Sequence, residues 1–262
     1  MPAPLSNRRR KAIASLTRRR HRRRHDQTII EGRRALDAAL DGDAPLVDCV
    51  VTEAALDTPE VQHLLGRLSV PVHVTEEDTM EQLTDVATPQ GIVAVVERRL
   101  VPADSLLDHT GRDATVLLLD GVQDPGNVGT LLRTAAWFGT TIVAAGPDTA
   151  GLYGPKVMRA AAGGHWALTL TRTETPGSLL DQLRRSGWSL YGADLQGVRA
   201  DAWTPERPSV LVLGSEAHGL SPAVLDRLDT PVSIPGASQR PAAESLNVAV
   251  AGGILVYEWI GP

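Results

Sequence analysis

The sequence contains a single cysteine, Cys49, and aromatic residues make up only 3% of its 262 positions. One thiol can form neither an intramolecular disulfide nor a thiolate zinc site, and it is typical of a reducing compartment. The seven histidines show none of the spacings of metal ligands, so we expect no metal. Scarce aromatics also argue against a protein that binds single strands by stacking their bases on aromatic rings.

Long hydrophobic runs are missing as well. No apolar segment approaches the roughly 20 residues of a membrane-spanning helix, so the sequence excludes an integral membrane protein of that kind and we expect no membrane partner. The N-terminal segment also lacks the apolar core of a secretory signal. We therefore expect the protein in the cytoplasm.

Positive charge is concentrated at the N-terminus. The formal net charge is −5, yet residues 1–25 contain ten Lys or Arg and no Asp or Glu. A basic arm on an acidic body is a common means of holding nucleic acid, although a solvated tail or a transit peptide would also explain it. We interpret residues 1–27 as an RNA-binding arm. The arginines expected to contact RNA are Arg18, Arg19, Arg20, Arg22, Arg23, Arg24, Arg33 and Arg34.

Two folded segments are expected after the arm. Residues 28–97 alternate between short β-branched runs and helical patterns, which predicts a small α/β domain. The polar, turn-rich residues 98–113 are expected to form a linker. In residues 114–262, strands that are apolar on both faces alternate with helices, which indicates a mostly parallel sheet covered by helices on both sides. The predicted strands of this second domain are 115–120, 141–146, 166–170, 189–194, 209–214 and 232–235.

Unusual residues follow three of these strands, and ligands of parallel sheets bind at the carboxyl ends of the strands. The first segment is LDGVQDPGNVGTLLRTAAWFG (119–139), in which Asn127 lies near a tight turn and Arg133 lies on the following helix. A capped turn with a surface arginine would give the same pattern. The two side chains converge only if Asn127 belongs to the turn, because six residues do not return to one helical face.

The other two segments are equally ambiguous when each is taken alone. In LVLGSEAHGLS (211–221), Glu216 lies between two glycines beyond a buried strand, and a plain loop would explain it. Neither a nucleophile elbow nor a phosphate-binding P-loop fits this segment. In SIPGASQRPAAESLNVAVAGGILVYE (233–258), Ser245 and Asn247 precede a helix of small residues, which Ser245 could cap.

Together, and in this order, the three segments resemble the SpoU/TrmH family of S-adenosylmethionine-dependent RNA ribose 2′-O-methyltransferases, which belong to the knotted SPOUT class. The similarity covers about 115–258 and includes GPKVMRAAAGG (154–164). Upstream, IIEGRRAL and ATPQGIVAVVE resemble the start and the end of the L30e-like substrate-binding domain of rRNA-directed members. A nicotinamide-dependent enzyme is disfavoured because no GxGxxG follows the first strand of the second domain.

The resemblance implies a trefoil knot in the C-terminal part and a homodimer whose active site lies near the interface. It also implies that Gly214, Ile234 and Leu246 bind the cofactor S-adenosylmethionine. The polar residues that it assigns to the site are Asn127, Arg133, Glu216, Ser245 and Asn247.

Arg133 occupies the catalytic position of the family. The resemblance leaves open whether Arg133 acts as a general base. Because an arginine is a poor base, we favour a charged side chain that holds a phosphate and stabilises a developing alkoxide. The loop 236–244 looks longer than is usual for the family, since it adds Arg240 and Pro241, and this leaves the fit around the adenine of the cofactor open.

The substrate predicted by the resemblance is 23S rRNA, modified either for housekeeping or for antibiotic resistance. A tRNA ribose 2′-O-methyltransferase and a non-catalytic RNA-binding or ribosome-assembly protein stay as alternatives.

Overall fold

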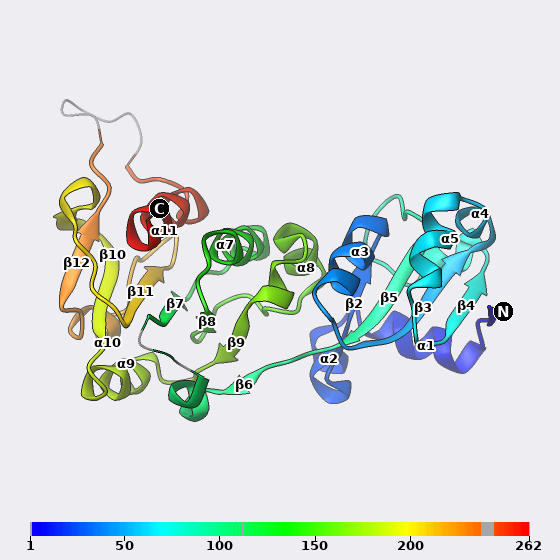
Figure 1. Cartoon of the computed structure of the whole chain (residues 1–262), viewed down its shortest axis with the longest axis horizontal. Helices are drawn as coiled ribbons and strands as arrows, with labels where there is room; N and C mark the ends of the chain where they lie inside the picture. The colour runs from blue at the N-terminus through cyan, green and yellow to red at the C-terminus, as the bar shows by residue number, and fades with distance from the viewer. Residues whose placement is uncertain (1, 110, 112, 237–243, 262) are drawn as a thin grey trace. The chain divides into compact units, whose positions relative to one another are not determined.

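The computed structural model describes residues 2–109, 111, 113–236 and 244–261 (Figure 1). The chain divides into two compact units. The first unit contains the residues up to Arg98 together with Tyr153–Trp166, and the second contains Arg99–Leu152 and the residues from Ala167 onward. Each unit has its own sheet.

The sheet of the first unit is mixed. Its strand order is β1-β4-β3-β5-β2, and β5 runs antiparallel to both of its neighbours while the other pairs are parallel. The strands are β1 (Ala3–Pro4), β2 (Gln27–Glu31), β3 (Leu46–Thr52), β4 (Val72–Thr75) and β5 (Ile92–Glu97). The helices are α1 (Asn7–Ser15), α2 (Arg19–His25), α3 (Arg33–Asp41), α4 (Glu53–Leu56), α5 (Pro59–Gly66), α6 (Glu77–Glu81) and α8 (Pro155–Ala161).

The basic N-terminal segment is not a separate arm. Its residues form α1 and α2, and Ile13 and Leu16 are buried in the core of the first unit with Ile29 of β2. The Arg9 guanidinium bonds the buried carboxylate of Asp48. The apolar residues between the two arginine runs therefore anchor the segment to the sheet, which the charge pattern alone did not indicate.

The sheet of the second unit is parallel throughout, with the strand order β12-β10-β11-β7-β8-β9-β6. The predicted mostly parallel sheet is thus confirmed. Its strands are β6 (Val101–Pro102), β7 (Thr115–Asp120), β8 (Ile142–Ala145), β9 (Thr169–Arg172), β10 (Ser189–Arg199), β11 (Ser209–Gly214) and β12 (Thr230–Ser233). The α-helices are α7 (Pro125–Phe138), α9 (Pro176–Arg185), α10 (Pro222–Leu225) and α11 (Val248–Ile260), and the 3-10 segments are η1 (Ala103–His109) and η3 (Ala200–Ala202).

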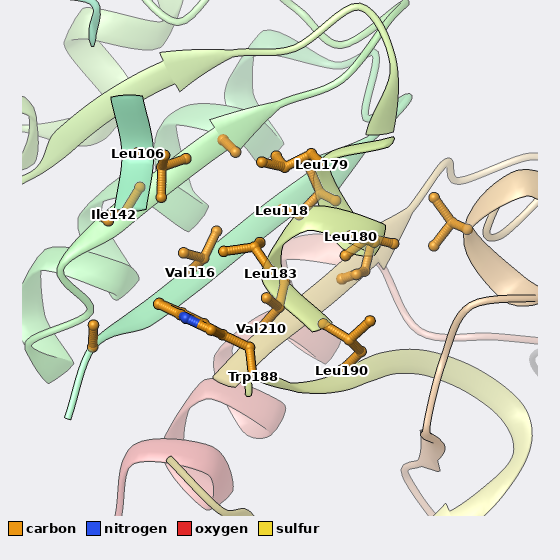
Figure 2. Close-up of a cluster of buried hydrophobic side chains, with 14 of the residues drawn as sticks. Leu106, Val116, Leu118, Ile142, Leu179, Leu180, Leu183, Trp188, Leu190 and Val210 are labelled. Carbon is orange, nitrogen blue, oxygen red and sulfur yellow. The ribbon is translucent and has the colours of Figure 1, made fainter. Parts of the chain in front are cut away.

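Helices cover both faces of this sheet. On one face, Val212 of β11 packs in a cluster with leucines of α9, and Figure 2 shows the cluster around Leu118 and Leu180. The next residue of β11, Leu213, points to the other face because side chains alternate along a strand. There it lies against Gly252 of α11, where a Cβ atom would stand only 2.7 Å from Leu213 and 2.3 Å from Leu131 of α7. The small residues of α11 thus let the helix pack closely inside the unit.

Residues 98–113 are more than a linker. Strand β6 pairs with β9, and Leu106 of η1 is fully buried in the cluster beneath α9. The polar neighbours of Leu106 hid this contribution, because a single buried leucine in a turn-rich segment produces no periodic pattern.

In the described ranges, no helix is both long and apolar enough to cross a membrane, and no group of three or more His, Cys, Asp or Glu residues is arranged to hold a metal ion. Cys49 lies in the core of the first unit, and burial raises the pKa of its thiol to about 12. This thiol is therefore protonated and unreactive at neutral pH.

Candidate functional site

The candidate site lies where two central strands end. β7 and β11 are parallel neighbours, and their last residues, Asp120 and Gly214, are register partners. The loops that follow them therefore leave the sheet side by side. The loop after β7 ends at Asp124, which caps α7 by accepting hydrogen bonds from the backbone N–H groups of Gly126 at 2.6 Å and Asn127 at 3.0 Å. Asn127 is consequently fixed in the first turn of the helix.

A hydrogen-bonded network joins all three predicted segments. The Nδ2 of Asn127 donates to Oε1 of Glu216 at 2.8 Å, and Oδ1 of Asn127 accepts from Nδ2 of Asn247 at 3.1 Å. The backbone N–H of Gln123 donates to the second oxygen of Glu216 at 3.4 Å. Asn127 therefore connects the loop after β11 with the start of α11, because its amide group donates a hydrogen bond to one and accepts a hydrogen bond from the other.

The third segment is fixed where it enters α11. Asn247, rather than Ser245, caps α11, because its Oδ1 accepts from the backbone N–H groups of Ala249 at 2.9 Å and Val250 at 3.3 Å. The same side chain uses its Nδ2 for the bond to Asn127. Capping and loop attachment are thus combined in one residue.

The loop of the second segment folds back on itself. Ser215 and Gly219 exchange two backbone hydrogen bonds of 2.9 Å, and Gly219 adopts a φ of +67°. A Cβ atom on Gly214 would lie 2.2 Å from the carbonyl carbon of Gly219, so only glycine fits at this strand end. Glu216 is presented at the tip of this tight loop.

Sequence reasoning missed Asp120, which fixes the base of the same loop. Asp120 is buried, and its Oδ2 accepts a 2.7 Å hydrogen bond from the backbone N–H of Ser221. The loop is thus attached at its base through Asp120 and at its tip through Glu216. A carboxylate that ends an otherwise apolar strand, as in TVLLLD, was the available signal.

The remaining predicted site residues do not join the network. Arg133 is exposed on α7, and Ser245 is exposed before α11; neither side chain makes a hydrogen bond or ion pair with another described residue. Leu246 is 49% exposed, and Ile234 is half-buried after β12. Arg240 and Pro241 of the longer loop fall within 237–243, outside the described residues, so that expectation stays a prediction.

The arginines predicted to bind RNA differ in their surroundings. The guanidinium of Arg22 donates to the backbone oxygens of Leu16 at 2.8 Å and Thr17 at 2.6 Å, so it closes the end of α1. Burial lowers the pKa of this guanidinium, and the nearby charge of Arg98 lowers it further. The other seven are exposed, namely Arg18, Arg19, Arg20, Arg23, Arg24, Arg33 and Arg34.

Comparison with known proteins connects this geometry to a family. Residues 114–257 match the SpoU rRNA Methylase family. The chain belongs to that family. Residues 7–94 match the MRM3-like substrate binding domain, so this SpoU-family chain has two recognisable parts. The predicted family is therefore confirmed.

Relatives of this SpoU-family chain cover most of its length. It is 34% identical over 234 residues to the Bacillus subtilis 23S rRNA (guanosine(2553)-2′-O)-methyltransferase RlmP. This alignment covers 89% of this chain and 88% of the relative. It is 30% identical over 237 residues to the 23S rRNA (guanosine-2′-O-)-methyltransferase RlmB of Xanthomonas axonopodis, and this alignment covers 87% of this chain and 94% of the relative.

Solved structures support the fold. The SpoU methyltransferase AviRb from Streptomyces viridochromogenes, in complex with the cofactor AdoMet (S-adenosylmethionine), superposes with a TM-score of 0.85 at 28% identity over 97% of both chains. A TrmH-family RNA methyltransferase structure from Porphyromonas gingivalis gives a TM-score of 0.83 at 34% identity over 98% of both chains. The predicted α/β fold is confirmed by both comparisons.

Proposed function

We propose that this chain transfers a methyl group from S-adenosylmethionine to a ribose 2′-hydroxyl of 23S rRNA. The observation that carries the proposal is the network of Asn127, Glu216 and Asn247, which joins three family segments at one sheet edge. The relatives described above are named as 23S rRNA guanosine 2′-O-methyltransferases, and AviRb was solved with this cofactor.

The described residues at this edge fit such a cofactor. An amphipathic ligand needs apolar contacts beside a few fixed polar groups. Leu246 supplies a half-exposed apolar side chain next to the Asn247 amide, and the absence of a side chain at Gly214 lets the backbone of Gly219 fold closely over the end of β11. We assign Gly214, Ile234 and Leu246 to cofactor binding. The bound cofactor supplies a methyl group that its sulfonium has already activated.

The chemistry left to the protein is positioning and charge stabilisation. In such a transfer the ribose oxygen would attack the methyl carbon in line with its C–S bond, so that this bond breaks and the neutral thioether leaves as the C–O bond forms. The hydroxyl proton would pass to water. A guanidinium group donates hydrogen bonds and accepts none, so we assign Arg133 to hold a phosphate of the target nucleotide and to stabilise the developing alkoxide. Asn127, Glu216 and Asn247 hold the loops in register, and exposed Ser245 is available to contact the ribose.

The test is the transfer of radiolabelled methyl groups from S-adenosylmethionine to transcribed, unmodified 23S rRNA, with tRNA in parallel and Arg133→Ala as a control. We expect label in the rRNA at an alkali-resistant linkage, which is characteristic of a methylated ribose. Label confined to tRNA would show that the proposed rRNA substrate is wrong. Cofactor binding without transfer to rRNA, to tRNA or to isolated large ribosomal subunits would favour a non-catalytic RNA-binding protein.

We also propose that the enzyme is a homodimer. An exposed apolar face runs over α7 and α11, which pack against each other through the rings of Phe138 and Tyr257. Its exposed members are Trp137 at 83%, Val250 at 52%, Ile254 at 37% and Tyr257 at 48%. Exposed apolar side chains on two helices that pack together are typical of a protein interface. Light scattering should give twice the chain mass of 27.9 kDa, and Ile254→Asp should reduce that mass to the monomer value.

The trefoil knot and the cytoplasmic location belong to the same proposal. β12 lies at one edge of the sheet, whereas the next element, α11, packs on β11 and α7, and this placement supports the proposed knot. A crystal structure traced through residues 233–248 tests the knot. The rRNA substrate favours the cytoplasm, and fractionation of cells that express the protein tests this location.

A further inference from the structure

Two of the exposed arginines of the first unit have side chains available for a ligand. Arg33 lies 3.8 Å from Glu60 in an exposed ion pair, and such pairs contribute little. The Arg34 side chain makes no hydrogen bond or ion pair with another described residue. By contrast, Arg67 nearby is bound to both Asp37 and Asp41. Arg33 and Arg34 are therefore the cations at this end of α3 that can bind an anion.

Two clefts open beside these arginines. One has a volume of about 630 Å³ and is also lined by Thr58, Val61, Glu77 and Gln90. The other has a volume of about 610 Å³ and is also lined by acidic side chains, Asp37 and Glu60. Both volumes are in the usual range for small-ligand sites. The first cleft, which we call the Gln90 cleft, suits an anionic ligand better because it holds a single carboxylate.

Two glycines shape the Gln90 cleft. At Gly32, where φ is +87°, a Cβ atom would lie 2.5 Å from Oε1 of Gln90. At Gly91, where φ is +72°, a Cβ atom would lie 2.7 Å from Oγ1 of Thr52. The absence of both side chains brings the Gln90 amide to the start of α3, beside the arginines. The exposed side chain of Gln90 makes no hydrogen bond with another described residue, so its amide is available to a ligand.

The cleft thus combines cations, an amide, a carboxylate and small apolar surfaces. Arginine forks match phosphate oxygens, and an amide with a carboxylate can pair with the edge of a base. Val61 and Pro89 supply apolar contacts for the face of a ring. An RNA nucleotide carries all of these partners, and its base is accessible only where the RNA leaves its helical stack.

We propose that the Gln90 cleft binds one unstacked nucleotide of the RNA substrate, with its phosphate on Arg33 and Arg34 and its base edge on Gln90 and Glu77. The inference rests on the proposed rRNA substrate, and it assigns base recognition to a site other than the methyl acceptor. Recognition at this cleft selects the RNA, whereas the network around Asn127 serves the transfer.

The experiment uses the full chain and a transcribed 23S rRNA fragment that carries the position corresponding to the one named for RlmP. Arg34→Ala and Gln90→Ala are compared with two matched controls, Arg185→Ala and Gln62→Ala, which remove an exposed arginine and an exposed glutamine outside the cleft. Filter binding gives the Kd for RNA, transfer kinetics give KM and kcat, and calorimetry gives the Kd for the cofactor. Thermal melting shows that each variant is folded.

We expect Arg34→Ala and Gln90→Ala each to raise the RNA Kd and the KM by about 10-fold, with kcat and the cofactor Kd unchanged. A fragment containing 4-thiouridine should crosslink to the peptide that includes Gln90. If the two variants bound RNA as tightly as the two controls, or if crosslinks were confined to other peptides, nucleotide binding in the Gln90 cleft would be wrong. The proposed methyl transfer would still stand. A wild-type protein that crosslinks at Gln90 but methylates no RNA would instead overturn the proposed function.

Discussion

The side-chain amide of Asn127 and the carboxylate of Glu216, 89 residues apart in the chain, are joined by a 2.8 Å hydrogen bond. The opposite side of the same amide accepts a bond from Asn247. A single side chain thus sets the distance between the loop after β11 and the start of α11. The proposed cofactor residues Gly214 and Leu246 lie on these two segments, so the bond fixes the shape of the site.

Replacing Asn127 by Ala should remove both bonds at once. A hydrogen bond to a charged group is worth about 1.5–3 kcal/mol, so we expect kcat/KM for methyl transfer to fall by roughly 10- to 100-fold. Thr130→Ala on the exposed side of α7 is the control and should retain activity. Equal activity of the two variants would show that the network does not shape the site.

Asp120 offers a test of loop attachment without touching the ligand. Asp120→Ala removes the acceptor for the Ser221 N–H, and the cofactor Kd should rise by about 10-fold because an unmade buried bond costs about 1–3 kcal/mol. Asp120→Asn keeps an oxygen acceptor and should recover most of the affinity. Calorimetric titration with S-adenosylmethionine measures both. Equal losses in the two variants would point to the charge of Asp120 rather than to its hydrogen bond.

Arg133→Ala should separate chemistry from binding. Loss of one group that stabilises developing charge costs about 100- to 1,000-fold in kcat, whereas the cofactor Kd should stay within a factor of about two. Single-turnover transfer and calorimetry provide the two numbers. If cofactor affinity collapsed together with the rate, Arg133 would be a binding residue and our assignment would be wrong.

The positive charge of α2 should act through phosphates alone. Arg20, Arg23 and Arg24 are exposed, and replacing all three by Gln should reduce the slope of log affinity against log salt by roughly 0.7–0.9 for each lost contact. Truncation of residues 1–25 is a poor test because it would also remove Ile13 and Leu16 from the core. An unchanged salt slope in the triple variant would exclude α2 from the RNA-binding surface.

A buried ion pair makes the first unit sensitive to pH once its cation is removed. Arg159 of α8 bonds Glu31 of β2 at 2.8 Å, and the Glu31 side chain is only 8% exposed. Burial raises the pKa of Glu31, while Arg159 lowers it. Arg159→Met should therefore raise this pKa further and lower the free energy of unfolding by about 3 kcal/mol at neutral pH.

The sign of the pH effect follows from linkage. A carboxyl whose pKa is raised in the folded state binds its proton more tightly there, so the folded state loses stability as the pH rises through that pKa. The deficit in Tm of Arg159→Met should therefore be larger at pH 8 than at pH 5. Adding Glu31→Gln should remove this dependence on pH. A deficit that is the same at both pH values would mean that Glu31 is not the source of the instability.

Local sequence determined much of the second unit. The run TVLLLD is apolar on both faces and forms the buried β7, and the Asp-Pro pair at 124 and 125 starts α7 as a capped helix. Strand and helix periods are local properties, so they could be found without knowledge of the neighbours. The family segments and their order were also visible, and they directed attention to the strand ends at which we propose the site.

Tertiary structure decided what packs against what. Ile13 and Leu106 occur in segments whose charge or turn residues dominate the pattern, yet both are fully buried. Tyr153–Trp166 lies inside the SpoU match but packs with the first unit, where Arg159 meets Glu31. The sequence also could not distinguish Ser245 from Asn247 as the cap of α11. Each outcome depends on surfaces and hydrogen-bond partners far apart in the chain, and only the folded backbone brings them within a few ångströms.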